Sequence, residues 1–215
     1  DVTRPLAACA RRMARELDGI SGYIFKARSP SCGVGSVVVQ GNRRRVTGNG
    51  IFAAGIMAAM PLLPVEQEDN LGDPARRENF FTRVLVYHRW QALQAQGLSA
   101  ARLVEFHSAH KLVLMAHGTE HYRSLGRLMA QVGKQPLRAF AHEYIDRLMT
   151  ALRHHATPRR HANVLMHLMG YLKKQLTPAD KTELLALIHA CRLGQAPLAV
   201  PLTMVVKVLL DNSDE

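Results

Sequence analysis

The residue with the clearest chemical potential in this sequence is Cys32, within the stretch Lys26–Gly33 (Lys-Ala-Arg-Ser-Pro-Ser-Cys-Gly). The apolar run Tyr23–Phe25 before it is typical of a buried strand, and the Ser, Pro and Gly residues after it break regular structure. The sequence therefore predicts that Cys32 lies on a tight turn. A thiol near Lys26, Arg28 and turn amides can be stabilised as a thiolate. The alternative is a plain turn with a half-buried free cysteine, because one cysteine makes neither a metal site nor a catalytic pair.

Histidines are the second group with chemical potential, since 11 of the 215 residues are His. His107, His110 and His117 fall within about a quarter-turn of one another at helical spacing. His161 and His167 stand on a later predicted helix, so a His-rich pocket results if these two helices face each other. Such a pocket can ligate a metal, move protons or bind an anion. The alternative is that each imidazole satisfies one buried hydrogen bond between helices.

Two further polar residues are candidates for lining a pocket. Asn79 lies in the stretch Arg76–Phe80, which opens the first long predicted helix, and Lys111 follows His110 directly. We expect them to line a site near the boundary between the N-terminal and helical parts. The alternative for such charged stretches is an ordinary surface ion pair.

The elements expected to position Cys32 alternate between helix and strand. A period of 3.6 in the apolar residues predicts a first helix, and short β-branched or aromatic runs predict strands. This order is typical of an α/β layer. The predicted elements are a helix at 5–17, strands at 23–25 and 37–39, an exposed loop at 40–50 and a short helix at 51–60.

From Asp73 onward the sequence predicts helices only. A capping residue opens nearly every segment and a glycine or proline closes it. The predicted segments are 73–96, 99–117, 119–133, 136–156, 157–176, 177–194 and 201–210. We therefore predict an α+β chain with a partial α/β domain at 1–60, a linker at 61–72 and an all-α helical bundle at 73–215.

Composition narrows the class of protein. An apolar content of 47% and a charged content of 21% are typical of a globular protein, and no apolar run is long enough to span a bilayer. Three cysteines argue against a disulfide framework and for the reducing cytoplasm. A net charge of +11 suggests an anionic partner such as RNA. Because the chain begins at Asp1 without a Met, we expect a processed, trimmed or partial polypeptide.

Two sets of residues resemble known families. Asp1-Val2-Thr3, the helix after it and the Lys26–Gly33 stretch resemble the second half of a TudS-type thiouracil desulfidase domain. The rest of the chain resembles a YbgA-like domain fused behind it. That second resemblance is carried by 49–53, 61–66, 77–80, 106–107, 110–112, 114–117, 161–165, 170–171 and 200–203.

The first resemblance implies desulfidase chemistry. In that family three cysteines hold a [4Fe–4S] cluster with one open iron, which binds the sulfur of thiouracil so that water can replace it, giving uracil and sulfide. Cys32 matches the last of these ligands, and Ser29 or Ser31 matches a polar residue that handles substrate or a proton. The other two ligands stand ahead of the residues that match Asp1–Thr3, whereas Cys9 and Cys191 match no ligand. The resemblance thus implies a cluster in the complete protein, with this chain as a fragment of a longer enzyme. The alternative is a protein that has lost this chemistry and kept the helical domain.

Three hypotheses follow for the function. The first is iron–sulfur-dependent desulfuration of a thiolated pyrimidine. The second is a non-catalytic, basic helical module that binds RNA or nucleotides. The third is a metal-dependent hydrolase that uses a pocket of His107, His110, His161 and His167.

Overall fold

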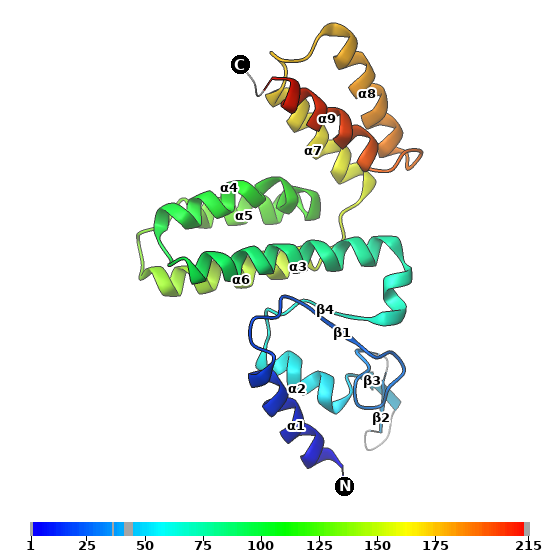
Figure 1. Cartoon of the computed structure of the whole chain (residues 1–215), viewed down its shortest axis with the longest axis vertical. Coiled ribbons are helices and arrows are strands. Elements are labelled where there is room, and N and C mark those ends of the chain that lie inside the picture. Colours follow the sequence, from blue (N-terminus) through cyan, green and yellow to red (C-terminus); the bar gives the residue numbers. More distant parts are fainter. Residues whose placement is uncertain (1, 36, 41–44, 213–215) are drawn as a thin grey trace.

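The computed structural model describes residues 2–35, 37–40 and 45–212, which form three parts stacked along the long axis (Figure 1). A part with short strands lies at the N-terminal end, a layer of long helices fills the middle and a smaller helical group closes the other end. Each part has its own cluster of buried apolar side chains. The predicted α+β class, with a small α/β part followed by helices, is confirmed.

Two small sheets shape the N-terminal part. Strand β1 pairs in parallel with β4, with Phe25 opposite Gln67, and β2 pairs antiparallel with β3. Helices α1 and α2 pack closely at Gly55, where an added Cβ would lie 2.5 Å from the Cβ of Ala10. The elements are α1 (Thr3–Glu16), β1 (Tyr23–Phe25), β2 (Val37–Gln40), β3 (Arg45–Gly48), α2 (Ile51–Ala59), β4 (Val65–Gln67) and the 3₁₀-helix η1 (Glu68–Gly72).

The structure corrects details of this region. The exposed loop predicted at 40–50 contains β3, which pairs antiparallel with β2, so that strand pairing rather than local propensity creates the strand. The first helix spans Thr3–Glu16, with Val2 as its N-cap, rather than the predicted range 5–17. The segment 61–72 contains β4 and η1, and the domain limits at 60 and 72 stay predictions.

Four of the helices from α3 onward begin at predicted side-chain caps, whereas α5, α6 and α9 have no side-chain cap hydrogen bond among the described residues. Asp73 accepts hydrogen bonds from the amides of Ala75 and Arg76, Ser99 and Thr157 cap the starts of α4 and α7, and Thr177 forms a capping box with Asp180. The bounds are α3 (Pro74–Ala95), α4 (Ala100–His117), α5 (Thr119–Met129), α6 (Leu137–Leu152), α7 (Pro158–Tyr171), α8 (Pro178–Arg192) and α9 (Ala199–Asp211).

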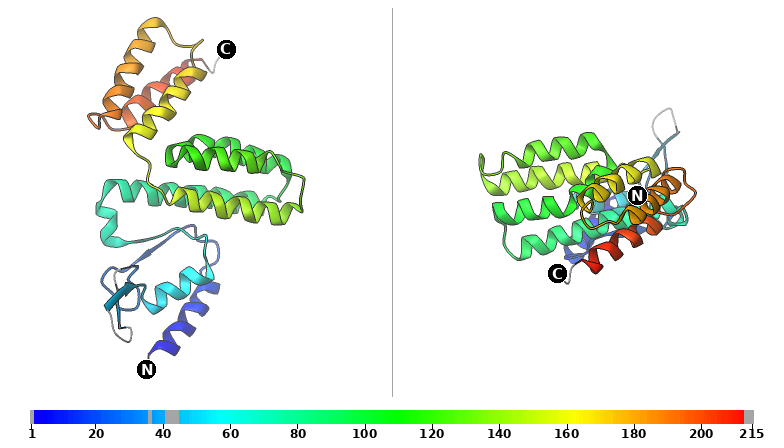
Figure 2. Two further views of the ribbon diagram at one scale, coloured as in Figure 1. Left: turned by 180° about the vertical axis from the view of Figure 1, so that it is seen from behind. Right: turned by 90° about the horizontal axis from the view of Figure 1, so that it is seen from above.

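The helical part contains two apolar clusters rather than one. Helices α3 to α6 lie side by side as a layer around Trp90, Phe106 and Tyr144 (Figure 2). Helices α7 to α9 enclose a second cluster that includes Leu165 and Leu184. Helices α4 and α7 pack on each other and join the two groups. None of the helices described here is both long and apolar enough to cross a membrane.

Candidate functional site

Cys32 lies on a turn that its own neighbours hold rigid. The Ser29 hydroxyl accepts a hydrogen bond from the Cys32 amide at 3.2 Å, and the Ser29 carbonyl accepts one from the Gly33 amide at 2.8 Å. The Ser31 hydroxyl lies 3.2 Å from the Ser29 hydroxyl and 3.5 Å from the Cys32 sulfur. The predicted turn is present, and it aligns two hydroxyls and a thiol in one chain of contacts.

The N-terminus of α2 holds this turn through backbone hydrogen bonds. The Ser31 carbonyl accepts hydrogen bonds from the amides of Phe52 and Ala53, at 3.0 and 3.2 Å. Gly50 passes so close that a Cβ there would lie 2.3 Å from the Ser31 carbonyl carbon and oxygen. Only glycine fits this position, so the cysteine turn and the start of α2 form one rigid unit.

We expect the replacement Gly50→Ala to lower the free energy of unfolding by about 2 kcal/mol, because backbone atoms must move to admit the methyl group. Urea unfolding followed by circular dichroism measures the change. Gly126→Ala is the matched control, since a Cβ at Gly126 meets no atom within 4 Å. Equal stability of the two variants would contradict the close approach.

The two cationic side chains predicted near Cys32, those of Lys26 and Arg28, make other contacts than expected. Lys26 forms an ion pair of 2.6 Å with Glu68. Arg28 is exposed, has a left-handed backbone with φ of 56°, and lines a hollow of about 360 Å³ with Ser29 and Val38. The amides of the turn bond within it, so they are not free donors for a thiolate. Of the two cations predicted beside Cys32, Lys26 is therefore paired with Glu68.

The residues described do not fit an iron–sulfur cluster by themselves. Such a cluster needs several thiolate ligands, whereas Cys9 lies on α1 and Cys191 is buried in α8. Within 2–35, 37–40 and 45–212, no three His, Cys, Asp or Glu side chains gather as a metal site. Cys32 alone supplies at most one of the thiolates that such a cluster needs.

His107 and His110 pack against the core of the middle layer. Nδ1 of His107 forms a hydrogen bond of 3.2 Å with the Tyr144 hydroxyl, and burial raises the pKa of Tyr144, so this hydroxyl keeps its proton. Nδ1 of His110 donates to the Phe106 carbonyl over 2.7 Å. Burial lowers the pKa of both imidazoles, and the nearby Lys111 adds to the effect on His107. Both histidines are therefore neutral structural groups of this core.

Nε2 of His110 is buried and has no hydrogen-bond partner among the described residues. We expect His110→Leu to leave the free energy of unfolding at pH 7.5 unchanged or to raise it by about 1 kcal/mol, because leucine removes an unsatisfied polar atom. Urea titration provides the measurement, with the exposed His167→Leu as control. A loss of more than about 2 kcal/mol would show that Nε2 has an essential partner.

The structure brings only part of the predicted His-rich pocket together. Helices α4 and α7 do pack on each other, and His117 and His161 line one cavity between them. His107 and His110 lie in the core of the middle layer, and His167 is exposed. The pocket of four histidines proposed for a hydrolase is therefore not assembled. Lys111 instead lies 6.0 Å from the ring centre of Tyr171.

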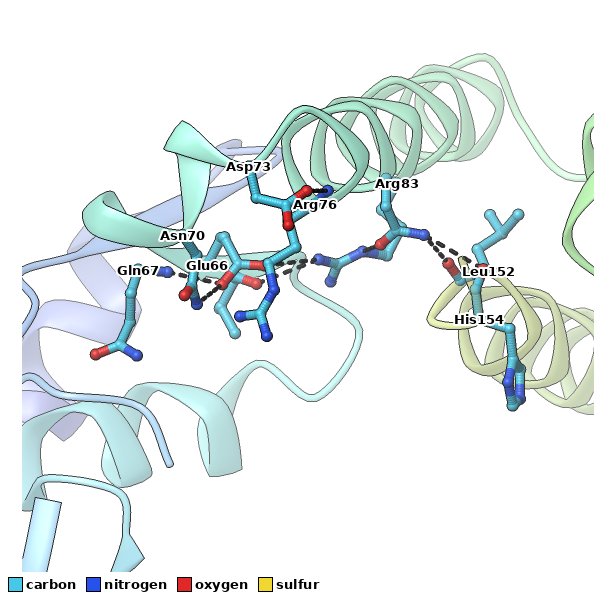
Figure 3. A network of polar contacts seen from close by, with 10 residues as sticks. Glu66, Gln67, Asn70, Asp73, Arg76, Arg83, Leu152 and His154 are labelled. Carbon is cyan, nitrogen blue, oxygen red and sulfur yellow. Dashed lines mark hydrogen bonds and ion pairs between the residues drawn. The ribbon is translucent and has the colours of Figure 1, made fainter. Parts of the chain in front are cut away.

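Asn79 belongs to a polar network that joins three elements. Figure 3 labels four other members of this network, Glu66, Arg83, Leu152 and His154. Its side-chain amide donates to the carbonyls of Leu152 and His154 at the end of α6, at 2.8 and 3.3 Å. Its side-chain oxygen accepts a hydrogen bond of 2.9 Å from Nε of Arg83. The guanidinium of Arg83 in turn lies 3.9 Å from the carboxylate of Glu66, a residue of β4. The predicted pocket residue Asn79 thus caps α6 and links it to α3 and the N-terminal part.

Sequence reasoning missed Arg83 and the His154 carbonyl. Arg83 stands one helical turn after Asn79, a spacing at which side chains meet, and this was the available signal. The His154 carbonyl also accepts a hydrogen bond from Nδ1 of His117. A local sequence pattern cannot predict this backbone acceptor, because it lies about 40 residues along the chain from His117 and about 75 from Asn79.

Comparisons with known proteins place both parts of the chain. Residues 1–68 match the family model of 2-thiouracil desulfurase, and residues 111–215 match a model described as a protein of unknown function, DUF1722. The Uncharacterized protein YbgA of Escherichia coli K12 is 36% identical over 124 residues, which cover 57% of this chain and 73% of YbgA. No solved structure matches the chain significantly. Both resemblances seen in the sequence are confirmed, and the chain belongs to the family of YbgA.

Proposed function

We propose that the N-terminal part of this chain belongs to an enzyme that removes sulfur from a thiolated pyrimidine. In this reaction one water and thiouracil give uracil and hydrogen sulfide. We further propose that Cys32 is one sulfur ligand of a [4Fe–4S] cluster whose other ligands lie outside the described residues. The observation that carries the proposal is the rigid Cys32 turn within the stretch that matches the 2-thiouracil desulfurase model.

The geometry of the turn supports this role. A cluster ligand must be held in one orientation, and the hydrogen bonds of Ser29 and the close approach of Gly50 provide that rigidity. The Ser31 hydroxyl contacts the Cys32 sulfur at 3.5 Å, so it can donate a hydrogen bond to a thiolate or to a bound pyrimidine. The hollow beside Arg28 gives a polar, cationic approach to the same turn. The free cysteines suit the reducing cytoplasm that the composition predicts.

The test uses the complete natural polypeptide, purified without oxygen, with iron and acid-labile sulfide measured on the same sample. We expect iron in the wild type, loss of iron and of sulfide release from 2-thiouracil in Cys32→Ser, and no loss in Cys9→Ser. Cys9 is the matched control because it lies half-buried on α1 and matches no ligand. Iron retained equally by both variants, or absent from the wild type, would refute the proposal.

We expect Ser31→Ala to lower kcat for sulfide release about tenfold while the iron content stays unchanged, because one hydrogen bond to the thiolate or substrate is lost. Single-turnover sulfide release gives the rate. Ser108→Ala, a change at an exposed site on α4, is the control. Parallel loss of iron and rate in Ser31→Ala would instead assign the hydroxyl to holding the turn.

A second candidate function is RNA or nucleotide binding by the helical part. It is favoured by the net charge of +11 and by a groove of about 430 Å³ between α7 and α8, lined by Arg159, Asn163, His189 and Arg192. Phosphate contacts make binding steeply salt-dependent. We expect Arg192→Glu to weaken RNA binding and to reduce its salt dependence, whereas Arg138→Glu on α6 does neither. Equal effects of the two variants would reject this groove.

A further inference from the structure

A cavity of about 300 Å³ lies where α3, α4, α7 and α9 meet. Its wall joins the two apolar clusters of the helical part, because Val113 packs on the middle layer and Leu165 belongs to the α7–α9 group. Most of the lining is aliphatic, with Val164, Leu168 and Leu202 as its larger members. A cavity of this size and lining is suited to a small organic molecule.

His117 gives this cavity a polar atom without a protein partner. Its side chain is 4% exposed, and its Nδ1 bonds to the His154 carbonyl. Because a carbonyl only accepts hydrogen bonds, Nδ1 carries the hydrogen and Nε2 of the neutral ring carries a lone pair. Burial lowers the pKa of His117, which keeps the ring neutral. In the part of the chain described, no hydrogen bond reaches Nε2, so this nitrogen is an acceptor available to a ligand.

The other polar residues of the lining are Glu78, Asn79 and Thr82 on α3 and His161 on α7. The Glu78 carboxylate lies 3.8 Å from Nε2 of His161, too far for a hydrogen bond, and its side chain is 59% exposed. Burial lowers the pKa of His161, although Glu78 partly opposes this effect. The cavity therefore offers the Glu78 carboxylate and Nε2 of His117 as acceptors, beside the Thr82 hydroxyl, and a ligand with a hydrogen-bond donor pairs with these acceptors.

The charges around the cavity select a neutral ligand. The Glu78 carboxylate in the wall disfavours an anion, and its 59% exposed side chain stands in water rather than among the aliphatic groups. The aliphatic lining penalises any charge that is not paired. What remains is a molecule with an apolar body and an N–H group.

We propose that this cavity binds a small, neutral, largely apolar heterocycle that donates an N–H hydrogen bond to the acceptors of Glu78 and His117. None of the residues that line the cavity lies within the first 72. The site is therefore separate from the Cys32 turn, and loss of the desulfuration proposal leaves it intact.

The test is a titration of the whole chain, with labelled Val and Leu methyl groups, by indole and by benzofuran. Benzofuran has the size of indole and lacks its N–H. We expect indole to cause saturable methyl shifts at Val164, Leu165 and Leu202, and benzofuran to bind at least about tenfold more weakly, because the acceptors stay unpaired. Equal affinity would refute the donor requirement, and shifts confined to other methyl groups, or no saturable shift, would refute the site.

Two variants fill the cavity from opposite walls. Val164→Trp acts from α7 and Leu202→Trp from α9, and we expect either to lower the affinity for indole at least about tenfold, since the free space is occupied. Val206→Trp is the matched control, because Val206 lies on α9, is 50% exposed and is not among the lining residues. Circular dichroism confirms that each variant is folded. If either Trp variant is folded and binds indole as tightly as the wild type, the proposal is wrong. If neither variant folds, the positions of the methyl shifts in the wild-type titration decide whether indole binds in this cavity.

Discussion

Replacing Asn79 with alanine is expected to lower the free energy of unfolding by about 2–3 kcal/mol, because one buried and two part-buried polar groups lose a partner at once. The carbonyls of Leu152 and His154 lose a donor, and the Arg83 guanidinium loses its acceptor. Asn79 is 5% exposed and the Arg83 side chain 12% exposed, so water compensates little. Urea unfolding of the whole chain at pH 7.5 measures the loss.

Two further variants separate the parts of this network. Asn163→Ala is the control for removing an asparagine, since Asn163 is exposed on α7. Asn79→Asp keeps an acceptor for Arg83 but places a carboxylate against two carbonyls, so we expect it to lose less stability than Asn79→Ala only if the Arg83 bond dominates. A loss in Asn79→Ala no larger than in Asn163→Ala would show that the network does not hold α6 in place.

Acidification is expected to destabilise the protein steeply below about pH 6.5. Burial lowers the pKa of His107, His110, His117 and His161 in the folded chain. In the unfolded chain each of these imidazoles has its ordinary pKa. At a pH between the folded and the unfolded pKa, the unfolded chain therefore binds more protons than the folded chain. Their stabilising contribution is thus fully present above about pH 6.5 and is lost as the pH falls toward the folded pKa values.

Each such histidine adds up to about 1.4 kcal/mol per pH unit, so the four together give a slope of up to about 5 kcal/mol per pH unit. Urea unfolding at steps between pH 7.5 and 5 measures this slope. His110→Leu removes one titrating group and should flatten the slope by up to about 1.4 kcal/mol per pH unit, whereas the exposed His167→Leu is the control. A free energy of unfolding that does not change across this range would contradict the burial of neutral imidazoles.

What the sequence predicts well is local. Asp73 with Pro74, and Thr177 with Asp180, mark helix starts through contacts within four residues, and the structure contains both caps. The Cys32 turn is equally local, because its serines, proline and glycine make the turn among themselves.

What the sequence does not predict depends on distant partners. The strand at Arg45–Gly48 exists because β2 lies beside it, and its residues alone read as a loop. Asn79 has an interior role only because the end of α6, more than 70 residues later, meets α3. The helix pattern likewise predicts which residues of α4 and α7 share a face, but not how far one helix is shifted along the other. His117 therefore lines a cavity with His161, whereas His107 bonds to Tyr144 of α6.

The parallel pair β1–β4 has a practical consequence for dividing this protein. Strand β4 leads through η1 directly into α3, and Gln67 at its end holds both backbone groups of Val34, at 3.1 and 2.9 Å, just past the cysteine turn. A polypeptide cut at residue 60 would leave β1 as an unpaired edge beside the buried ring of Phe25, a template for self-association. A cut after Gly72 keeps the pair together, so the choice of boundary decides whether an isolated N-terminal fragment aggregates.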